Sequence, residues 1–194
     1  MAKQTIAMAH IAVLGLGNWG TAIARLWLLE GHKVKGWTIE EEVYQSITLD
    51  DVNAKYLPNH PVKGLDATMH LSEALKESEI IVLAVPSSVI LDVVEDIMPH
   101  LQPGHVLLDL AKGLAPGKRL ISQAIHGMLK DAGKTNPLAV LTGPTIAPEA
   151  AGGVMTTALV ASEDDAVANR LASTLSTPSF ILHPASDPVG AELW

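Results

Sequence analysis

Short apolar runs alternate along the chain with stretches that carry apolar residues at helical spacing. Strands buried on both faces of a parallel sheet read as near-continuous apolar runs. Such runs predict strands at residues 10–16, 33–37, 79–86, 105–111, 138–143, 156–162 and 179–184. Amphipathic stretches between them predict helices at residues 19–31, 71–78, 87–98, 117–132 and 163–175. The alternation predicts an α/β fold, a doubly wound, mostly parallel sheet with helices on both faces.

Two places in this pattern carry further predictions. Residues 50–68 fit neither the strand pattern nor the helix pattern, because Pro58, Pro61 and Gly64 interrupt both. We expect irregular structure there. Ser162, with Asp165 three residues later, predicts a capping box at the start of the last helix.

A glycine motif lies between the first predicted strand and the first predicted helix. The sequence VLGLGNWGTAIA holds Gly15, Gly17 and Gly20 in the GxGxxG spacing. In that context the glycines allow a tight turn, close approach of a pyrophosphate to the backbone, and close packing of helix on strand. The helix N-terminus then faces the anion. The motif predicts a Rossmann-type dinucleotide-binding domain, and its alternative is a glycine-rich turn without a ligand.

The end of the second strand normally carries the residue that contacts the adenosine ribose. Glu40 lies at the expected distance, about 20 residues past the motif, and Glu41 and Glu42 follow it. No lysine or arginine occurs between Trp37 and Lys55. A 2'-phosphate would meet like charge there without a guanidinium partner, which predicts a preference for NAD over NADP. The alternative is that the three acids are only the solvated first turn of a helix.

Further candidates lie in segments that follow strands, at the edge where α/β sheets bind ligands. These segments are VPSS (85–88), AKGL (111–114) and GPTIAPEAAGG (143–153). Lys112 could place an ammonium near a phosphate or a developing alkoxide, or be a solvated lysine. Gly143, Thr145 and Ala147 could present backbone amides and a hydroxyl to a ligand, or only turn the chain around Pro144.

Composition narrows the classes of partner. A chain of 194 residues with 48% hydrophobic content can bury one substantial core. A formal net charge of −8 and scattered cationic residues argue against nucleic acid or an anionic membrane and favour a small metabolite. No segment approaches the roughly 20 apolar residues of a membrane span. The absence of cysteine suits a cytoplasmic protein, and eight histidines without an HExxH pattern predict no metal site.

Together, six segments resemble the NAD(P)-dependent glycerol-3-phosphate dehydrogenases. They are GLGNWGTAIA, NAKYLP, AVPS, AKGL, GPTIAPEAAGG and DPVGAEL, in the order and with the spacing of that family along the whole chain. The resemblance implies an NAD(P)-dependent oxidoreductase with a small phosphorylated substrate. It implies reversible hydride transfer between the nicotinamide and the dihydroxyacetone phosphate/glycerol 3-phosphate pair, a route into phospholipid synthesis.

The resemblance also assigns roles by position. It places Asn18 and Trp19 at the pyrophosphate, Lys112 near both cofactor and substrate, and Gly143 and Thr145 on the substrate side. Lys112 is also the only catalytic candidate that it supplies. Ala147 corresponds to a further cofactor contact.

At Thr38 and Ile39 the chain departs from the resemblance. Bacterial members often carry a basic residue at this point. The departure weakens the case for NADP.

A larger departure follows DPVGAELW. In the family a principal catalytic lysine comes next, and then a helical domain that holds the substrate phosphate. We therefore expect residues 1–194 to be a dinucleotide-binding domain without that helical domain, inactive or weakly active alone. The alternative is a non-catalytic nucleotide-binding or sensor module derived from the family. Exposed Val189, Leu193 and Trp194 would favour a homo-oligomer.

Overall fold

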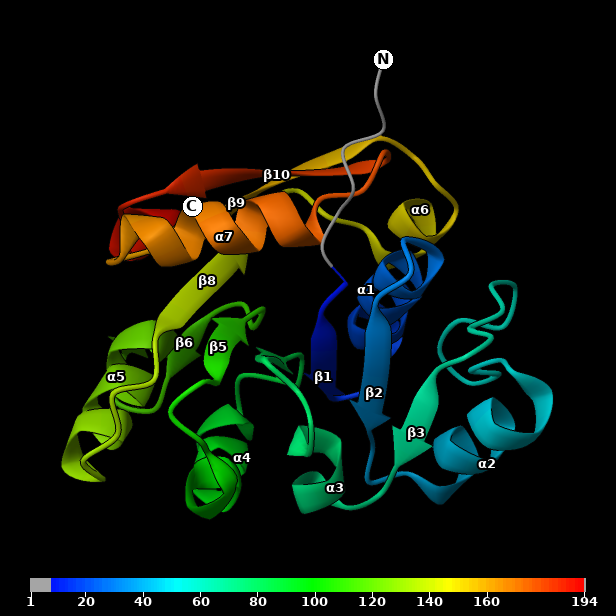
Figure 1. Ribbon diagram of the computed structural model, residues 1–194, viewed down its shortest axis with the longest axis horizontal. Coiled ribbons are helices and arrows are strands. Elements are labelled where there is room, and N and C mark those ends of the chain that lie inside the picture. The colour runs from blue at the N-terminus through cyan, green and yellow to red at the C-terminus, as the bar shows by residue number, and fades with distance from the viewer. Residues whose placement is uncertain (1–7, 194) are drawn as a thin grey trace.

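A computed structural model describes residues 8–193 of the chain, so the expectation for Trp194 lies outside the described residues. One sheet of eight strands runs through the molecule in the order β10-β9-β8-β5-β4-β1-β2-β3 (Figure 1). The strands are β1 (His10–Leu14), β2 (Lys33–Trp37), β3 (Asp66–Thr68), β4 (Ile80–Leu83), β5 (Val106–Asp109), β8 (Leu138–Thr142), β9 (Thr156–Ser162) and β10 (Phe180–Ala185). Every neighbouring pair is parallel except β8 and β9. The predicted fold class is confirmed.

Helices cover both faces of this sheet. They are α1 (Asn18–Leu29), α2 (Glu41–Asp50), α3 (Leu71–Leu75), α4 (Ile90–Ile97), α5 (Ile121–Asp131), α6 (Ala147–Ala151), α7 (Asp165–Leu175) and α8 (Pro188–Glu192), with a 3-10 turn at Met98–His100. One apolar core lies under α1, α2 and α7, and the other lies under α3, α4 and α5. In Figure 1, α7 lies alongside β9 and β10.

The central strands show why the apolar runs are continuous. In β1, Ile11 and Val13 enter the first core, whereas Ala12 and Leu14 enter the second. Side chains alternate between the faces of a sheet, so a strand covered on both sides needs apolar residues at every position. All four residues of β4 are buried for the same reason.

Several boundaries differ from the sequence prediction. The helix expected from residue 117 begins at Ile121, because a short hairpin of β6 (Leu114–Ala115) and β7 (Arg119–Leu120) precedes it. Gly117 and Lys118 make its turn with φ of 79° and 58°. The irregular region expected at residues 50–68 ends in β3, whose three residues are too few for a periodic pattern.

The predicted capping box at Ser162 is wrong. Asp164 caps α7 instead, and its carboxylate accepts hydrogen bonds from the backbone N–H groups of Ala166 and Val167. Ser162 is still in β9, where its hydroxyl donates to the Leu138 carbonyl at 2.9 Å. Asp164 lies two positions nearer the helix and can reach the first N–H groups, whereas Ser162 is too far back to do so.

Candidate nucleotide site

Parallel pairing brings the candidate segments to one edge of the sheet. Leu14 of β1 lies beside Trp37 of β2 and Leu83 of β4, and Leu83 lies beside Asp109 of β5. Asp109 in turn lies beside Val140 of β8. The loops that follow β1, β2, β4, β5 and β8 therefore start from the same side, which we call the carboxyl edge. Ligands of open α/β sheets bind at such an edge.

The glycine motif forms a tight turn between β1 and α1. Gly15 has φ of 106°, and a Cβ on it would lie 2.7 Å from the Ala84 carbonyl oxygen. A Cβ on Gly20 would lie 1.9 Å from the Gly15 carbonyl oxygen. Any side chain at these two positions would collide with backbone, so the fold itself requires both glycines.

Gly17 is different, because the fold does not require a glycine there. Its φ is −73°, and a Cβ on it would have no heavy atom within 4 Å. Gly17 precedes the first turn of α1, which has twelve residues and no acid in its first turn. The open space and the unpaired N–H groups at a helix N-terminus fit a pyrophosphate.

Asn18 and Trp19 occupy the first two positions of α1. Asn18 is exposed. The Trp19 ring packs edge-on against Phe180, with ring centroids 6.0 Å apart at 71°. Since the indole is committed to the core, the group that Trp19 can offer an anion is its backbone N–H.

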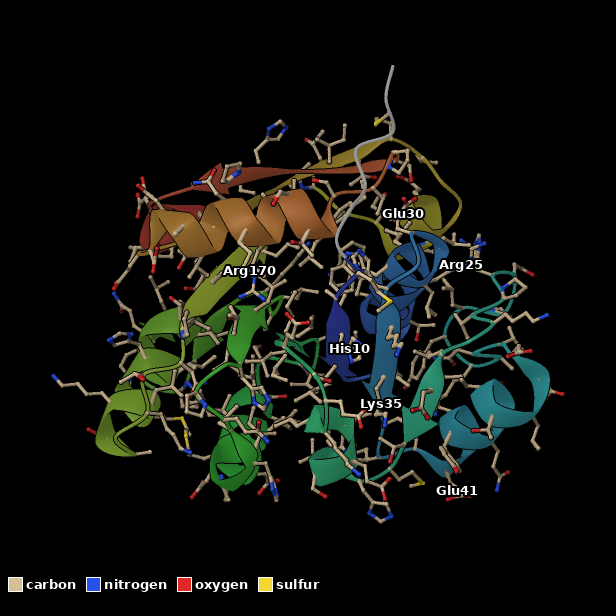
Figure 2. All side chains as sticks on the ribbon, viewed as in Figure 1. His10, Arg25, Glu30, Lys35, Glu41 and Arg170 are labelled. Carbon is tan, nitrogen blue, oxygen red and sulfur yellow. The ribbon has the colours of Figure 1, made fainter. Side chains whose placement is uncertain are left out.

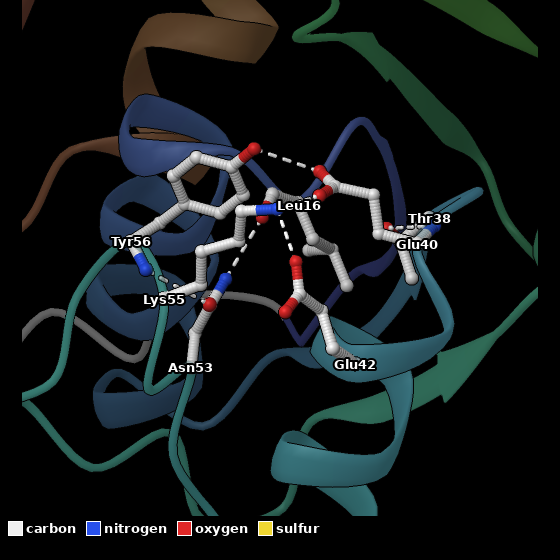
Figure 3. A network of polar contacts seen from close by, with 7 residues as sticks. All are labelled: Leu16, Thr38, Glu40, Glu42, Asn53, Lys55 and Tyr56. Carbon is white, nitrogen blue, oxygen red and sulfur yellow. Dashed lines mark hydrogen bonds and ion pairs between the residues drawn. The ribbon is translucent and has the colours of Figure 1, made fainter.

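A cluster of charged side chains surrounds Glu40 in the turn that follows β2 (Figure 3). Lys55 forms ion pairs with Glu40 and Glu42, and Tyr56 Oη donates to Glu40 Oε1 at 2.8 Å. Hydrogen bonds from Lys55 and then Tyr56 lower the pKa of Glu40. Glu41 and Glu42 are in the first turn of α2, as the alternative interpretation held, whereas Glu40 is the preceding cap residue.

Asn53 fixes this cluster to the glycine turn. Its buried side-chain amide donates to the Leu16 carbonyl and to Thr21 Oγ1, each at 2.8 Å, and its Oδ1 accepts from Tyr56 N–H at 3.2 Å. A single side chain therefore holds the NAKYLP segment against the β1–α1 turn. This explains how Lys55, fifteen residues from Glu40, comes to lie beside it.

Lys112 lies in the exposed loop after β5. The next residue, Gly113, has φ of 107°, and a Cβ on it would lie 3.7 Å from Ser87 Oγ in the loop after β4. The AKGL and VPSS segments therefore meet at the carboxyl edge. Lys112 can reach a ligand there, because its ammonium has a flexible four-carbon stem.

A buried carboxyl group stands three residues before Lys112. Asp109 is fully buried, and its Oδ1 accepts the Ala111 N–H at 2.8 Å. Its Oδ2 has no partner within the described part of the chain. Burial, with a smaller contribution from the negative charge of Glu192, raises the pKa of Asp109 to about 7.

Glu192 connects α8 to the N-terminus of α5. Its Oε1 accepts from the Ile121 N–H at 2.6 Å and from the Ser122 N–H at 3.3 Å. The Ser122 hydroxyl donates to Oε2. A carboxylate at a helix N-terminus is favoured both by the free N–H groups and by the helix dipole.

The segment after β8 packs on the outside of α1. A Cβ on Gly143 would meet Ala158 at 3.0 Å, and the Thr145 N–H donates to the Gly143 carbonyl at 2.9 Å. Ala147 is buried in a cluster with Ala22 of α1, Leu57 and Ala151, so only its backbone remains for a ligand. Arg25 of α1, labelled in Figure 2, donates to the Pro61 and Ala151 carbonyls at 3.0 and 2.9 Å.

Several residues of this site received no role in the sequence analysis. They are Arg25, Asn53, Lys55, Tyr56, Asp109 and Glu192. A lone carboxyl group inside the apolar run HVLLDLA was a visible signal for Asp109. The segments NAKYLP and DPVGAEL marked the neighbourhoods of Asn53, Lys55, Tyr56 and Glu192. The partners of these residues are distant in sequence, so the segments did not show what each side chain contacts.

Sites of other kinds could lie away from the carboxyl edge. A cavity of about 690 Å³ lies between α5, the start of β8 and α8, and Lys130, Asn136 and Val189 are among its lining residues. Residues 8–193 contain no group of three or more acidic or histidine side chains placed to hold a metal ion. None of the helices described in this range has the length and apolarity to cross a membrane.

A doubly wound sheet with a glycine turn, an open helix N-terminus and an acidic residue after β2 defines a Rossmann-type dinucleotide-binding protein. Residues 10–168 match the family model described as NAD-dependent glycerol-3-phosphate dehydrogenase N-terminus, and the chain belongs to that family. This confirms the resemblance drawn from the six segments.

Individual relatives agree with the family match. A glycerol-3-phosphate dehydrogenase [NAD(P)+] from Acidobacterium capsulatum is 37% identical over 192 residues, which are 96% of this chain and 57% of the relative. Its counterpart from Corynebacterium urealyticum is 32% identical over 96% of this chain and 56% of the relative. The crystal structure of a Coxiella burnetii glycerol-3-phosphate dehydrogenase superposes with a TM-score of 0.84 at 30% identity, covering 93% of this chain and 54% of that one. The chain thus spans about half the length of these relatives.

Proposed function

We propose that this chain is the cofactor-binding part of an NAD(P)-dependent glycerol-3-phosphate dehydrogenase. The observation that carries the proposal is Gly17, whose missing side chain leaves space that no described protein atom fills. Family membership supports the reaction, hydride transfer between the nicotinamide and the dihydroxyacetone phosphate/glycerol 3-phosphate pair. We assign residues 1–194 to one dinucleotide-binding domain. The homologous full-length enzymes add a second half that this chain does not span.

The carboxyl edge suggests how these residues would act on a dinucleotide. The N–H groups of Asn18 and Trp19, at the start of α1, would bind the pyrophosphate. Glu40 would accept from the adenosine ribose, and the Ala147 backbone would contact the cofactor. When bound, the nicotinamide supplies or accepts the hydride.

On the substrate side, the proposal gives Lys112 an electrostatic role. Its ammonium would stabilise the negative charge that develops on the substrate oxygen and attract the phosphate group. The Gly143 backbone and the Thr145 hydroxyl would hold the substrate beside it. The resemblance places a second lysine, the principal general acid, after the segment DPVGAELW. General acid catalysis by that lysine would raise the rate by about 10²- to 10⁴-fold. Turnover by this chain alone should therefore be weak or absent.

Cofactor preference is part of the same proposal. The carboxylates of Glu40 and Glu42 follow β2, and a 2'-phosphate bound beside them would be repelled by their negative charge. We therefore propose that NAD binds more tightly than NADP, by a margin that the nearby ammonium of Lys55 reduces. Calorimetric titration with both cofactors tests this, and tighter binding of NADP would contradict it.

Gly17→Ala tests nucleotide binding directly. Because the φ of −73° suits any residue and the added methyl meets no protein atom, the variant should fold with nearly unchanged thermal stability. The methyl would occupy the space of the pyrophosphate, so NADH affinity should fall about tenfold or more. Gly104→Ala is the matched control, since its Cβ also meets nothing within 4 Å. Equal NADH affinity in both variants would refute a nucleotide site at this turn.

Other expectations remain predictions of this proposal. A non-catalytic nucleotide-binding module is the alternative, and it would bind NADH while the second half of the homologous enzymes, supplied separately, failed to restore turnover with dihydroxyacetone phosphate. Recovered turnover would support the enzyme. A role in phospholipid synthesis, a cytoplasmic location and a homo-oligomeric state also stay predictions.

A further inference from the structure

Lys55 brings a positive charge to the acidic end of β2, where Glu40 and Glu42 stand (Figure 3). Its side chain is 41% exposed and that of Glu40 is 33% exposed, so both can reach a ligand from solvent. Lys55 pairs with Glu40 Oε2, whereas Tyr56 donates to Glu40 Oε1. Each oxygen of Glu40 therefore has a donor in the free protein, and each retains acceptor capacity, because a carboxylate can accept about four hydrogen bonds.

The backbone of the segment that carries Lys55 is fixed. Asn53 is fully buried and joins Leu16 of the glycine turn to the Tyr56 N–H. The segment therefore holds a constant position relative to the proposed pyrophosphate site. The lysine side chain beyond it is long and partly exposed, so its ammonium can change partners without moving the backbone.

The two cofactors make opposite electrostatic demands on this cluster. The ribose 2'-hydroxyl of NAD is a donor, and the Glu40 carboxylate can accept from it while keeping Lys55 and Tyr56. The 2'-phosphate of NADP is an acceptor with a charge of about −1.5 to −2 at neutral pH. A 2'-phosphate beside Glu40 and Glu42 needs a cation as a partner. The ion pairs of Lys55 with these two carboxylates place its ammonium at that point.

We propose that Lys55 is a specificity-determining residue that allows this site to accept NADP. In the NADP complex the Lys55 ammonium leaves Glu40 and Glu42 and pairs with the 2'-phosphate. In the NAD complex it stays on Glu40, which accepts from the ribose. The inference rests on the dinucleotide binding proposed above, and it assigns the choice between the cofactors to a residue outside β2 and its following turn.

Lys55→Met tests the proposal, because it removes the charge and keeps most of the side-chain length. The Kd for NADPH should rise about tenfold or more, the usual loss when a charge-assisted hydrogen bond is removed, whereas the Kd for NADH should change less than about threefold. Lys55→Arg keeps a cation and should bind NADPH within about threefold of the wild-type chain. Both affinities can be measured by titration of nicotinamide fluorescence at fixed salt concentration.

Lys63→Met is the matched control, since Lys63 is also an exposed lysine of the same irregular region. It should leave both affinities unchanged. Parallel losses of NADH and NADPH binding in Lys55→Met would overturn the inference, because they would mean that Lys55 only orients Glu40. Unchanged NADPH binding would also overturn it. If the wild-type chain binds neither cofactor, the proposed function fails first and the inference fails with it.

Glu40→Gln provides an independent variant. The carboxylate that it removes both competes for Lys55 and repels the 2'-phosphate. NADPH should therefore bind about threefold to tenfold more tightly. NADH should bind more weakly, because an amide oxygen is a poorer acceptor than a carboxylate. A change of the same sign for both cofactors would contradict the assignment.

Discussion

Asp109 shows most clearly what burial does to a single residue of this protein. Its carboxyl group is fully buried at the end of β5, with one oxygen bonded to the Ala111 N–H and the other without a described partner. Transfer of a charge into such a site is unfavourable, and the nearby Glu192 adds repulsion. The neutral form is therefore favoured in the folded protein, and its pKa rises to about 7.

That raised pKa predicts how stability depends on pH. The contribution of neutral Asp109 is complete below its unfolded pKa, about 4, and is lost as the pH rises through about 7. Asp109→Asn keeps the acceptor for Ala111 without the charge, so at pH 8 it should raise the free energy of unfolding by roughly 1–4 kcal/mol. The gain should shrink towards pH 4. Urea denaturation at both pH values measures it, and exposed Asp50→Asn is the control. A gain independent of pH would contradict the argument.

At the scale of the elements, side chains of other elements help to hold the irregular segment between α2 and β3. Asn53 holds it to the glycine turn, and Arg25 of α1 donates to Pro61 farther along it. Proline and glycine prevent a regular structure there, so side chains from other elements supply hydrogen bonds that a helix or strand would make internally.

Asn53→Ala should destabilise the whole chain. It removes one of the two donors to the buried Leu16 carbonyl, which keeps the Thr21 hydroxyl at 3.1 Å. It also leaves the Tyr56 N–H without its partner and creates a small cavity. The expected loss is about 2–4 kcal/mol in the free energy of unfolding, seen as a lower urea midpoint. Asn169→Ala on the exposed side of α7 is the control and should change stability by less than about 1 kcal/mol. Equal effects would show that the Asn53 hydrogen bonds contribute little.

At the scale of the whole molecule, the two faces of the sheet are covered unequally. Leu159 of β9 and Ile181 of β10 point away from the core under α7, and they are 39% and 37% exposed. Val189 of α8 is 37% exposed, and Leu193, the residue that follows this helix, is 68% exposed. Exposure agrees with the sequence expectation for Val189 and Leu193. Apolar surface of this kind favours association with another protein surface.

We expect this chain to self-associate through that surface. Light scattering at increasing concentration should give a mass above that of the monomer, and the double substitution Leu159→Glu with Ile181→Glu should return it towards the monomer. Leu49→Glu is the control, because Leu49 is 78% exposed on α2, away from these strands. A monomer at every concentration would show that the exposed residues are too dispersed to drive association.

The sequence by itself determined the fold class, the glycine turn and the main strands. These features follow from local rules, since a buried strand such as β4 must be apolar throughout and Gly15 must adopt a positive φ. Local patterns also located Glu40 and Lys112 after their strands. The hairpin before α5 and the short β3 were missed, because two- and three-residue strands have no measurable period.

Only the tertiary structure decided which charges meet. Read along the chain, Glu40 has no cation near it, whereas in the fold Lys55 lies against it because Asn53 holds the intervening loop to the glycine turn. In the same way, burial changed Asp109 from an ordinary acid in a strand into a group with a pKa of about 7. Hydrogen bonding and desolvation depend on distance in space, and sequence separation does not report that distance.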